Sequence, residues 1–173
     1  VLPYTIQNYL ADQITVPRFS TELPEFAEAE KAVQARIDHL MGIKGKKSVD
    51  SIHKELGHIM WEYVGMGRTE EGLKTALKLL KDIRKEFETN LFIPGSTEGV
   101  NIELEKALRL NDFITMGELI AYDALNRNES CGGHFREEYQ TEEGEAKRDD
   151  ENYFYVSCWE YQGSDDVAPV LYK

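Results

Sequence analysis

The sequence lacks any apolar run that approaches the roughly 20 residues of a transmembrane helix, and no signal peptide opens its 173 residues. We therefore expect no direct membrane insertion. Cysteine is also scarce, since Cys131 and Cys158 are the only two. That number excludes a disulfide framework and favours a reducing, cytoplasmic compartment. Such a compartment disfavours the remaining alternative, a single bond between the two.

Motifs that bind phosphate or activate a serine nucleophile are missing as well. The patterns G-x-G-x-x-G, G-x-x-x-x-G-K and G-x-S-x-G do not occur. Gly65 and Gly67 lie between two predicted helices and indicate a turn. The chain shows no means of binding a dinucleotide by itself, so we expect no cofactor in it.

Basic side chains are in the minority, with 20 Lys and Arg against 32 Asp and Glu and a formal net charge of -12. Such a surface repels nucleic acids and anionic membranes, so we expect no nucleic-acid partner. The acidic residues are densest near the C-terminus, which we interpret as a solvated face. They are Glu137, Glu138, Glu142, Glu143, Glu145, Asp149, Asp150 and Glu151.

A metal site is not expected either. His53 and His58 lie on one predicted helix with Glu55 between them, an arrangement that superficially resembles a zinc-protease helix. The two histidines are five positions apart, which places them about 140° apart around the helix. Zinc ligands on one helix must share a face. We therefore interpret both as surface or half-buried histidines and predict no metal.

Apolar residues recur every three or four positions in five segments, which predicts five helices. The segments are residues 4–14, ending near Pro17; 24–42; 48–65; 69–87; and 102–126. Ser48 and Thr69 are predicted N-caps, and Pro24 suits a first helical turn. Each segment is apolar on one side only, so these sides must be buried against one another. Short loops favour antiparallel neighbours, and the residues therefore predict an up-down helical bundle.

After Asn126 the helical pattern stops. Residues 127–152 have no apolar stripe, and residues 153–161 are dense in aromatic and β-branched side chains, which predicts a strand. Residues 163–166 indicate a turn, and residues 170–172 suit a return strand. The C-terminal part is therefore predicted to be an irregular segment followed by a β-hairpin.

The segment from Arg127 to Asn152 contains the residues that are most informative about chemistry. Its three arginines, Arg127, Arg136 and Arg148, can each form a two-pronged pair with a carboxylate. The carboxylates available are Glu129, Glu137, Asp149 and Asp150. Alternatively, an acid–base site could be built on His134 and Glu129. We favour a loop held rigid by ion pairs, because such networks perturb side chains without catalysing a reaction.

This segment resembles a motif of the succinate dehydrogenase, fumarate reductase and L-aspartate oxidase flavoproteins, R-x-E-S-R-G-x-H-x-R followed by R-D-D. The matching residues are Arg127, Glu129, Ser130, Gly132, His134, Arg136, Arg148, Asp149 and Asp150. The stretch from Leu56 to Trp61, followed by Gly72 and Leu73, is similar to the helical domain of the same family. The similarity covers nearly the whole chain, and residues 127–152 are called the signature loop below.

The resemblance implies a mainly α fold, an antiparallel three-helix bundle like a spectrin repeat, with an N-terminal helix and an irregular, β-hairpin tail. It implies that residues 1–20 end a preceding FAD-binding domain, that 21–127 form the bundle, and that 128–173 form the signature loop and tail. The matching residues are expected to have a structural and interface role, with no catalytic residue in this chain, which would be inactive alone.

The parent subunit implied by the resemblance holds FAD and interconverts succinate and fumarate, and an iron–sulfur subunit passes electrons to a membrane quinone. Expected partners are its own FAD-binding and capping domains and the iron–sulfur subunit, in a complex peripheral on the inner face of the cytoplasmic membrane. Two departures, Cys131 in place of Arg and the insert 140–147, suggest a Bacteroides-like branch. The alternatives are L-aspartate oxidase, adenylylsulfate reductase, or a free-standing acidic helical interaction module.

Overall fold

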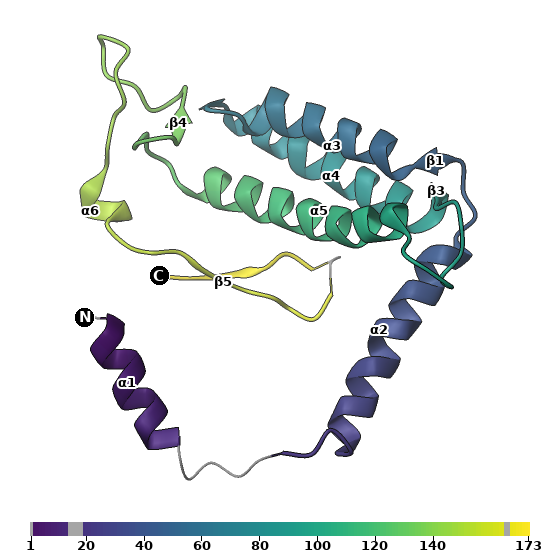
Figure 1. Ribbon diagram of the computed structural model, residues 1–173. Coiled ribbons are helices and arrows are strands. Elements are labelled where there is room, and N and C mark those ends of the chain that lie inside the picture. The colour runs from purple at the N-terminus through teal and green to yellow at the C-terminus, as the bar shows by residue number, and fades with distance from the viewer. Residues whose placement is uncertain (1, 14–18, 165–166) are drawn as a thin grey trace. The chain divides into compact units, whose positions relative to one another are not determined.

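The computed structural model describes residues 2–13, 19–164 and 167–173. This part of the chain is mainly helical and has small strand pieces, which confirms the predicted fold class (Figure 1). The chain divides into two compact units, Val1–Asp38 and His39–Lys173. The second unit contains the bundle and the signature loop.

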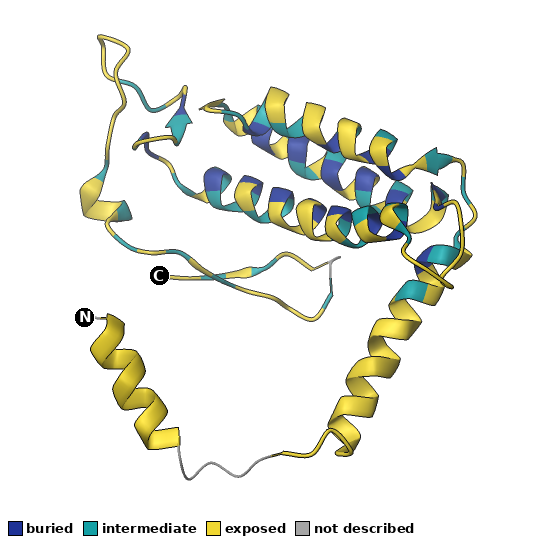
Figure 2. Ribbon diagram, viewed as in Figure 1, coloured by how far each residue is buried: buried dark blue, intermediate teal, exposed yellow. Residues whose placement is uncertain are grey.

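The first unit contains helix α1 (Leu2–Asp12) and most of helix α2 (Pro24–Gly42). Pro24 opens α2 as predicted, whereas the predicted end of the first helix at Ile14 and Pro17 lies outside the described residues. The prediction that the α2 stripe is buried is wrong for this unit, because Phe26 and Val33 are 48% and 59% exposed (Figure 2). Within the first unit, α1 has no buried residue that could form a core with this stripe.

Helices α3 (Val49–Val64), α4 (Glu70–Asn90) and α5 (Ile102–Asn126) form the three-helix bundle of the second unit. Each packs on the other two, and consecutive helices run in opposite directions (Figure 1). Ser48 and Thr69 cap α3 and α4 as predicted, and Asn101 caps α5. The stripes of the three helices meet in one core (Figure 2), whose fully buried members include Ile52, Leu73, Leu80, Phe87, Leu110 and Ile114.

Two short parallel strand pairs lie at the ends of the bundle, one pair at each end. Strand β1 (Lys47–Ser48) pairs with β3 (Leu91–Phe92), and β2 (Gly67–Arg68) pairs with β4 (Phe135–Arg136). The second pair links the α3–α4 connection to the signature loop, and so fixes the position of that loop against the bundle.

The C-terminal segment contains a helical turn, α6 (Asp150–Tyr153), and an antiparallel hairpin of β5 (Cys158–Glu160) and β6 (Val170–Tyr172). The return strand is confirmed. The strand predicted over residues 153–161 is wrong in its first half: Tyr153 ends the helical turn that Asp149 caps, and residues 154–157 are irregular. Of the predicted turn, Asp165 and Asp166 lie outside the described residues.

The hairpin is joined to the bundle by Trp159, whose Nε1–H donates to Asp123 of α5 at 2.9 Å. Within the described ranges, no helix combines the length and the hydropathy that a membrane span requires.

Candidate functional site

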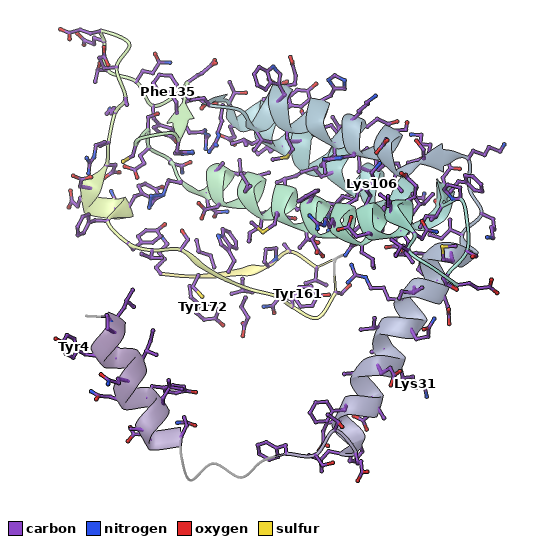
Figure 3. All side chains as sticks on the ribbon, in the orientation of Figure 1. Tyr4, Lys31, Lys106, Phe135, Tyr161 and Tyr172 are labelled. Carbon is purple, nitrogen blue, oxygen red and sulfur yellow. The ribbon has the colours of Figure 1, made fainter. Side chains whose placement is uncertain are left out.

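The up-down order brings three helix ends together at one end of the bundle: the C-termini of α3 and α5 and the N-terminus of α4 (Figure 1). A helix C-terminus has unpaired carbonyl groups and a partial negative charge, and an N-terminus has unpaired N–H groups and a partial positive charge. The signature loop lies at this end, where β4 pairs with β2. Figure 3 labels Phe135 of β4 in this region.

Arg136 is completely buried and binds the end of α5. Its Nη1 donates to the carbonyl oxygens of Ala124 and Leu125 at 3.0 and 3.3 Å, and its Nε donates to Glu138 at 3.1 Å. The guanidinium also lies 5.4 Å from the ring centroid of Tyr139. The sequence predicted that this arginine pairs with a carboxylate, but Glu138 was not among the predicted carboxylates. The predicted partner was therefore wrong.

Glu138 connects Arg136 to the start of α4, because its second oxygen accepts the backbone N–H of Glu70. Burial opposes ionisation of this carboxyl. The bonds from the backbone N–H groups of Glu70 and Glu138 and from Arg136 outweigh burial and hold the pKa of Glu138 below its usual value. One ion pair therefore joins the C-terminus of α5 to the N-terminus of α4.

Arg68 and His134 connect the ends of α3 and α5. Nε of Arg68 donates to the carbonyl oxygens of Val64 and Gly65 at 3.2 and 2.7 Å. Its Nη1 lies 2.8 Å from Nδ1 of His134, and Nε2 of His134 lies 2.9 Å from the carbonyl oxygen of Arg127, the residue that follows α5. His134 thus connects Arg68, which binds the C-terminal end of α3, to Arg127, which directly follows α5.

Arg127 and Glu129 form an ion pair of 3.3 Å, one of the pairs that the sequence offered. The Nη2 of Arg127 donates to the carbonyl oxygens of Tyr153 and Tyr155, and its guanidinium lies over both rings at 5.7 and 5.5 Å. The second oxygen of buried Glu129 accepts the N–H of Asp149 at 2.8 Å. These contacts hold the beginning of the loop against its end.

The acid–base alternative does not match this geometry. His134 is bonded to Arg68 and to the Arg127 carbonyl, and Glu129 to Arg127 and the Asp149 N–H. Both side chains of such a site are therefore bonded to other groups of this chain.

Ser130 and Gly132 shape the backbone of the loop. The hydroxyl of Ser130, which is fully buried, accepts the N–H of Arg136 at 2.8 Å and donates to its carbonyl oxygen at 3.0 Å. Gly132 has a φ of 58° in the tight turn between Cys131 and His134, a conformation that L side chains rarely adopt.

The R-D-D part lies at the exposed end of the loop. Both Nε and Nη2 of Arg148 donate to one oxygen of Asp150, at 3.0 and 2.7 Å, and Asp149 caps α6. Most of the nine matching residues thus serve the backbone, the helix ends or a local cap, and among their ion pairs the Arg148–Asp150 pair is largely exposed.

The insert 140–147 forms a hairpin that is closed at its base. Thr141 N–H donates to the carbonyl oxygen of Glu145 at 2.9 Å, and Lys147 N–H donates to that of Tyr139 at 3.2 Å. From Thr141 to Lys147 the residues are exposed. The insert lengthens the chain between the H-x-R and R-D-D parts, while Glu129 still reaches Asp149. Cys131, which stands where the family motif has Arg, is a half-buried free thiol.

Sequence reasoning missed Arg68 and Glu138. Arg68 lies just after the predicted end of α3, where a basic side chain can bond the last carbonyl groups, and this position was the available signal. Glu138 lies two positions from Arg136, which was a local signal for their ion pair. Its bond to the N–H of Glu70, 68 positions away in the sequence, had no such signal.

Comparison with known proteins identifies the class of domain. Residues 53–173 match the family model described as fumarate reductase flavoprotein C-term, a segment that includes α4, α5 and the whole signature loop. This chain belongs to that family, the C-terminal domain of succinate dehydrogenase and fumarate reductase flavoproteins, which confirms the resemblance noted in the sequence.

Individual proteins agree with this assignment. The chain is 29% identical over 148 residues to the fumarate reductase flavoprotein subunit of Proteus vulgaris, covering 83% of this chain and 24% of that protein. It is 37% identical over 88 residues to a chloroplastic L-aspartate oxidase of Nicotiana tabacum, covering 51% and 13%. A variant of E. coli quinol fumarate reductase FrdA superimposes with a TM-score of 0.68 at 25% identity, covering 91% and 26%. The chain spans about a quarter or less of each.

The start of α4 does not suit the pyrophosphate of FAD. Dinucleotide phosphates bind where helix N-termini offer free N–H groups. The N-termini of α3, α4 and α5 are capped by Ser48, Thr69 and Asn101, and the start of α4 also bears the carboxylate of Glu138. A pyrophosphate would meet negative charge there.

Proposed function

We propose that this chain is the structural and docking domain of a flavoprotein subunit that interconverts succinate and fumarate. One observation carries the proposal: the side chains of Arg136, Glu138 and Glu129 in the signature loop bond helix ends and backbone groups of this chain. Family membership supplies the class of parent enzyme. In the complete subunit, FAD and the reacting groups would belong to other domains.

The proposed partners follow from the same membership. The bundle end with the signature loop would face the FAD-binding and capping domains of the subunit. An iron–sulfur subunit would pass the electrons to quinone. The complex would be peripheral on the cytoplasmic face of the membrane, because the similar E. coli protein is a quinol fumarate reductase and quinols are membrane-soluble.

L-aspartate oxidase is the second candidate for the parent, and the match to the Nicotiana tabacum enzyme favours it. That match covers 51% of the chain, whereas the Proteus vulgaris subunit covers 83%. An assay of the complete subunit with succinate and with L-aspartate as electron donors distinguishes the two candidates.

The first experiment tests whether this chain is catalytic by itself. The purified chain is mixed with FAD, freed of unbound flavin, and examined for flavin absorbance and for dye reduction by succinate. We expect neither, because the chain has no Gly-rich phosphate-binding motif and the start of α4 bears the carboxylate of Glu138. Retained flavin that succinate reduces would overturn the docking role.

A further inference from the structure

The ring of His134 has both nitrogens engaged, and the partners fix its protonation state. Nδ1 lies 2.8 Å from Nη1 of Arg68, and Nε2 lies 2.9 Å from the carbonyl oxygen of Arg127. A guanidinium only donates and a carbonyl oxygen only accepts. The ring is therefore neutral, with its single proton on Nε2. A second proton on Nδ1 would point at an N–H of Arg68 with no acceptor between them.

The charges that surround the ring disfavour that second proton. Burial lowers the pKa of His134; the bond to the Arg127 carbonyl opposes this effect, and the positive charges of Arg68, Arg136 and Arg127 add to it. These arginines come from β2, from β4 and from the end of α5.

The acidic groups of this region bond other residues. The carboxylates are Asp123 of α5, bonded to Trp159, and Glu129 and Glu138, bonded to Arg127 and Arg136. Asp123 and Tyr155 line the recess that contains His134, and Cys131 is joined to His134 through the backbone. An imidazolium here would face three guanidinium groups with no carboxylate bonded to it among the described residues.

We propose that His134 is an acid-sensitive latch, in which protonation of Nδ1 breaks the bond to Arg68 and so favours an open state. In that state the segment from Arg127 to Arg136 has left the end of α3 and the β2–β4 pairing is lost as well. The released side chains can separate because the turn at Cys131 to His134 has an exposed side, formed by Gly132 and Gly133. This device goes beyond the docking role and does not depend on it, since every group involved belongs to this chain.

The size of the effect follows from proton linkage. The open segment has an ordinary histidine, whose pKa is about 6.5, and the closed segment has one with a lower pKa. As the pH falls below about 6.5, the open state binds a proton that the closed state does not. The opening constant therefore rises by at most about tenfold per pH unit, and it levels off once the closed state also titrates.

Hydrogen exchange of the full chain, corrected for the intrinsic pH dependence of amide exchange, measures this opening from about pH 7.5 to about pH 5. In the wild type, we expect opening of the segment from Arg127 to Arg136 to rise toward that limit on acidification. In His134→Gln, which has a neutral side chain at every pH, the corrected exchange of this segment should stay constant. The matched control is His39→Gln, since His39 is exposed and bonded to Glu88, and it should behave as the wild type.

A flat wild-type profile, or a slope that persists in His134→Gln, would overturn the proposal. If His134→Gln does not fold, nitrogen NMR of the wild-type ring decides the question. The latch requires a neutral ring with its proton on Nε2 above about pH 7, and protonation at the pH where the segment opens. A ring protonated at neutral pH, or one that titrates without any change in exchange, would equally overturn it.

Discussion

At the scale of single residues, the three arginines of the signature loop differ mainly in burial. The side chain of Arg136 is 1% exposed, that of Arg127 is 22% exposed, and that of Arg148 is 57% exposed. The most buried one binds helix carbonyl groups, whereas the most exposed one binds only a nearby aspartate. The arginines of one motif therefore differ in how much they contribute to stability.

Replacing Arg136 by Met should destabilise the chain by about 3 kcal/mol, because the carbonyl groups of Ala124 and Leu125 and the carboxylate of Glu138 lose a charged donor. Urea unfolding monitored by circular dichroism measures this loss. The matched control, Arg148→Met, removes an exposed pair and should leave the stability nearly unchanged. Equal losses in the two variants would show that Arg136 does not hold the helix ends together.

At the scale of elements, the bundle is closed at its other end by the β1–β3 pair. Gly45 N–H donates to the carbonyl oxygen of Leu91 at 2.8 Å, and Lys46 N–H donates to that of Asn90 at 2.9 Å. The two backbones are so close that a Cβ on Gly45 would lie 2.0 Å from backbone atoms of Asn90. This close approach, rather than a turn conformation, requires glycine here.

The substitution Gly45→Ala should therefore separate the strands and cost about 2–3 kcal/mol in the free energy of unfolding. Gly57→Ala is the control, because Gly57 lies in α3 with nothing within 4 Å of its added Cβ. That variant should be stabilised by up to about 1 kcal/mol through helix propensity. Thermal melts of both variants measure the difference, and a neutral Gly45→Ala would contradict the described packing of the two strands.

The elements show what the sequence could predict and what it could not. Long stripes with side-chain caps, as at Ser48 and Thr69, predicted α3 and α4, since their signals are local and repeat over many residues. The parallel pairs β1–β3 and β2–β4 have two residues a strand and hence no periodicity to detect. Aromatic and β-branched residues predicted a strand from residue 153, but the local cap by Asp149 prevailed there.

In the candidate site too, the sequence could predict pairs of nearby residues but not bonds between residues that are distant in the sequence. The pair Arg127–Glu129 could be proposed from the sequence because its members are two positions apart. The bonds from Arg68 to His134 and from Glu70 to Glu138 join residues 66 and 68 positions apart, and only the packing of the three helices brings them together.

At the scale of the whole molecule, the bundle and the signature loop of the second unit form one connected structure. The loop joins the ends of α3, α4 and α5, and the hairpin is joined to α5 through Trp159 and Asp123. We propose that these polar residues support the domain and its docking, while the chemistry of the subunit would occur in other domains.

The most direct test of this claim is the substitution Glu129→Gln in the complete flavoprotein subunit, followed by steady-state kinetics normalised to bound flavin. Glutamine retains an acceptor for the Asp149 N–H but loses the charge that pairs with Arg127, so we expect a stability loss of about 1–3 kcal/mol and reduced flavin content. Correctly assembled enzyme should keep a turnover within a few-fold of the wild type. A stable, fully flavin-loaded variant whose turnover falls by about a thousandfold, or about 4 kcal/mol in the barrier, would make Glu129 catalytic and contradict the account.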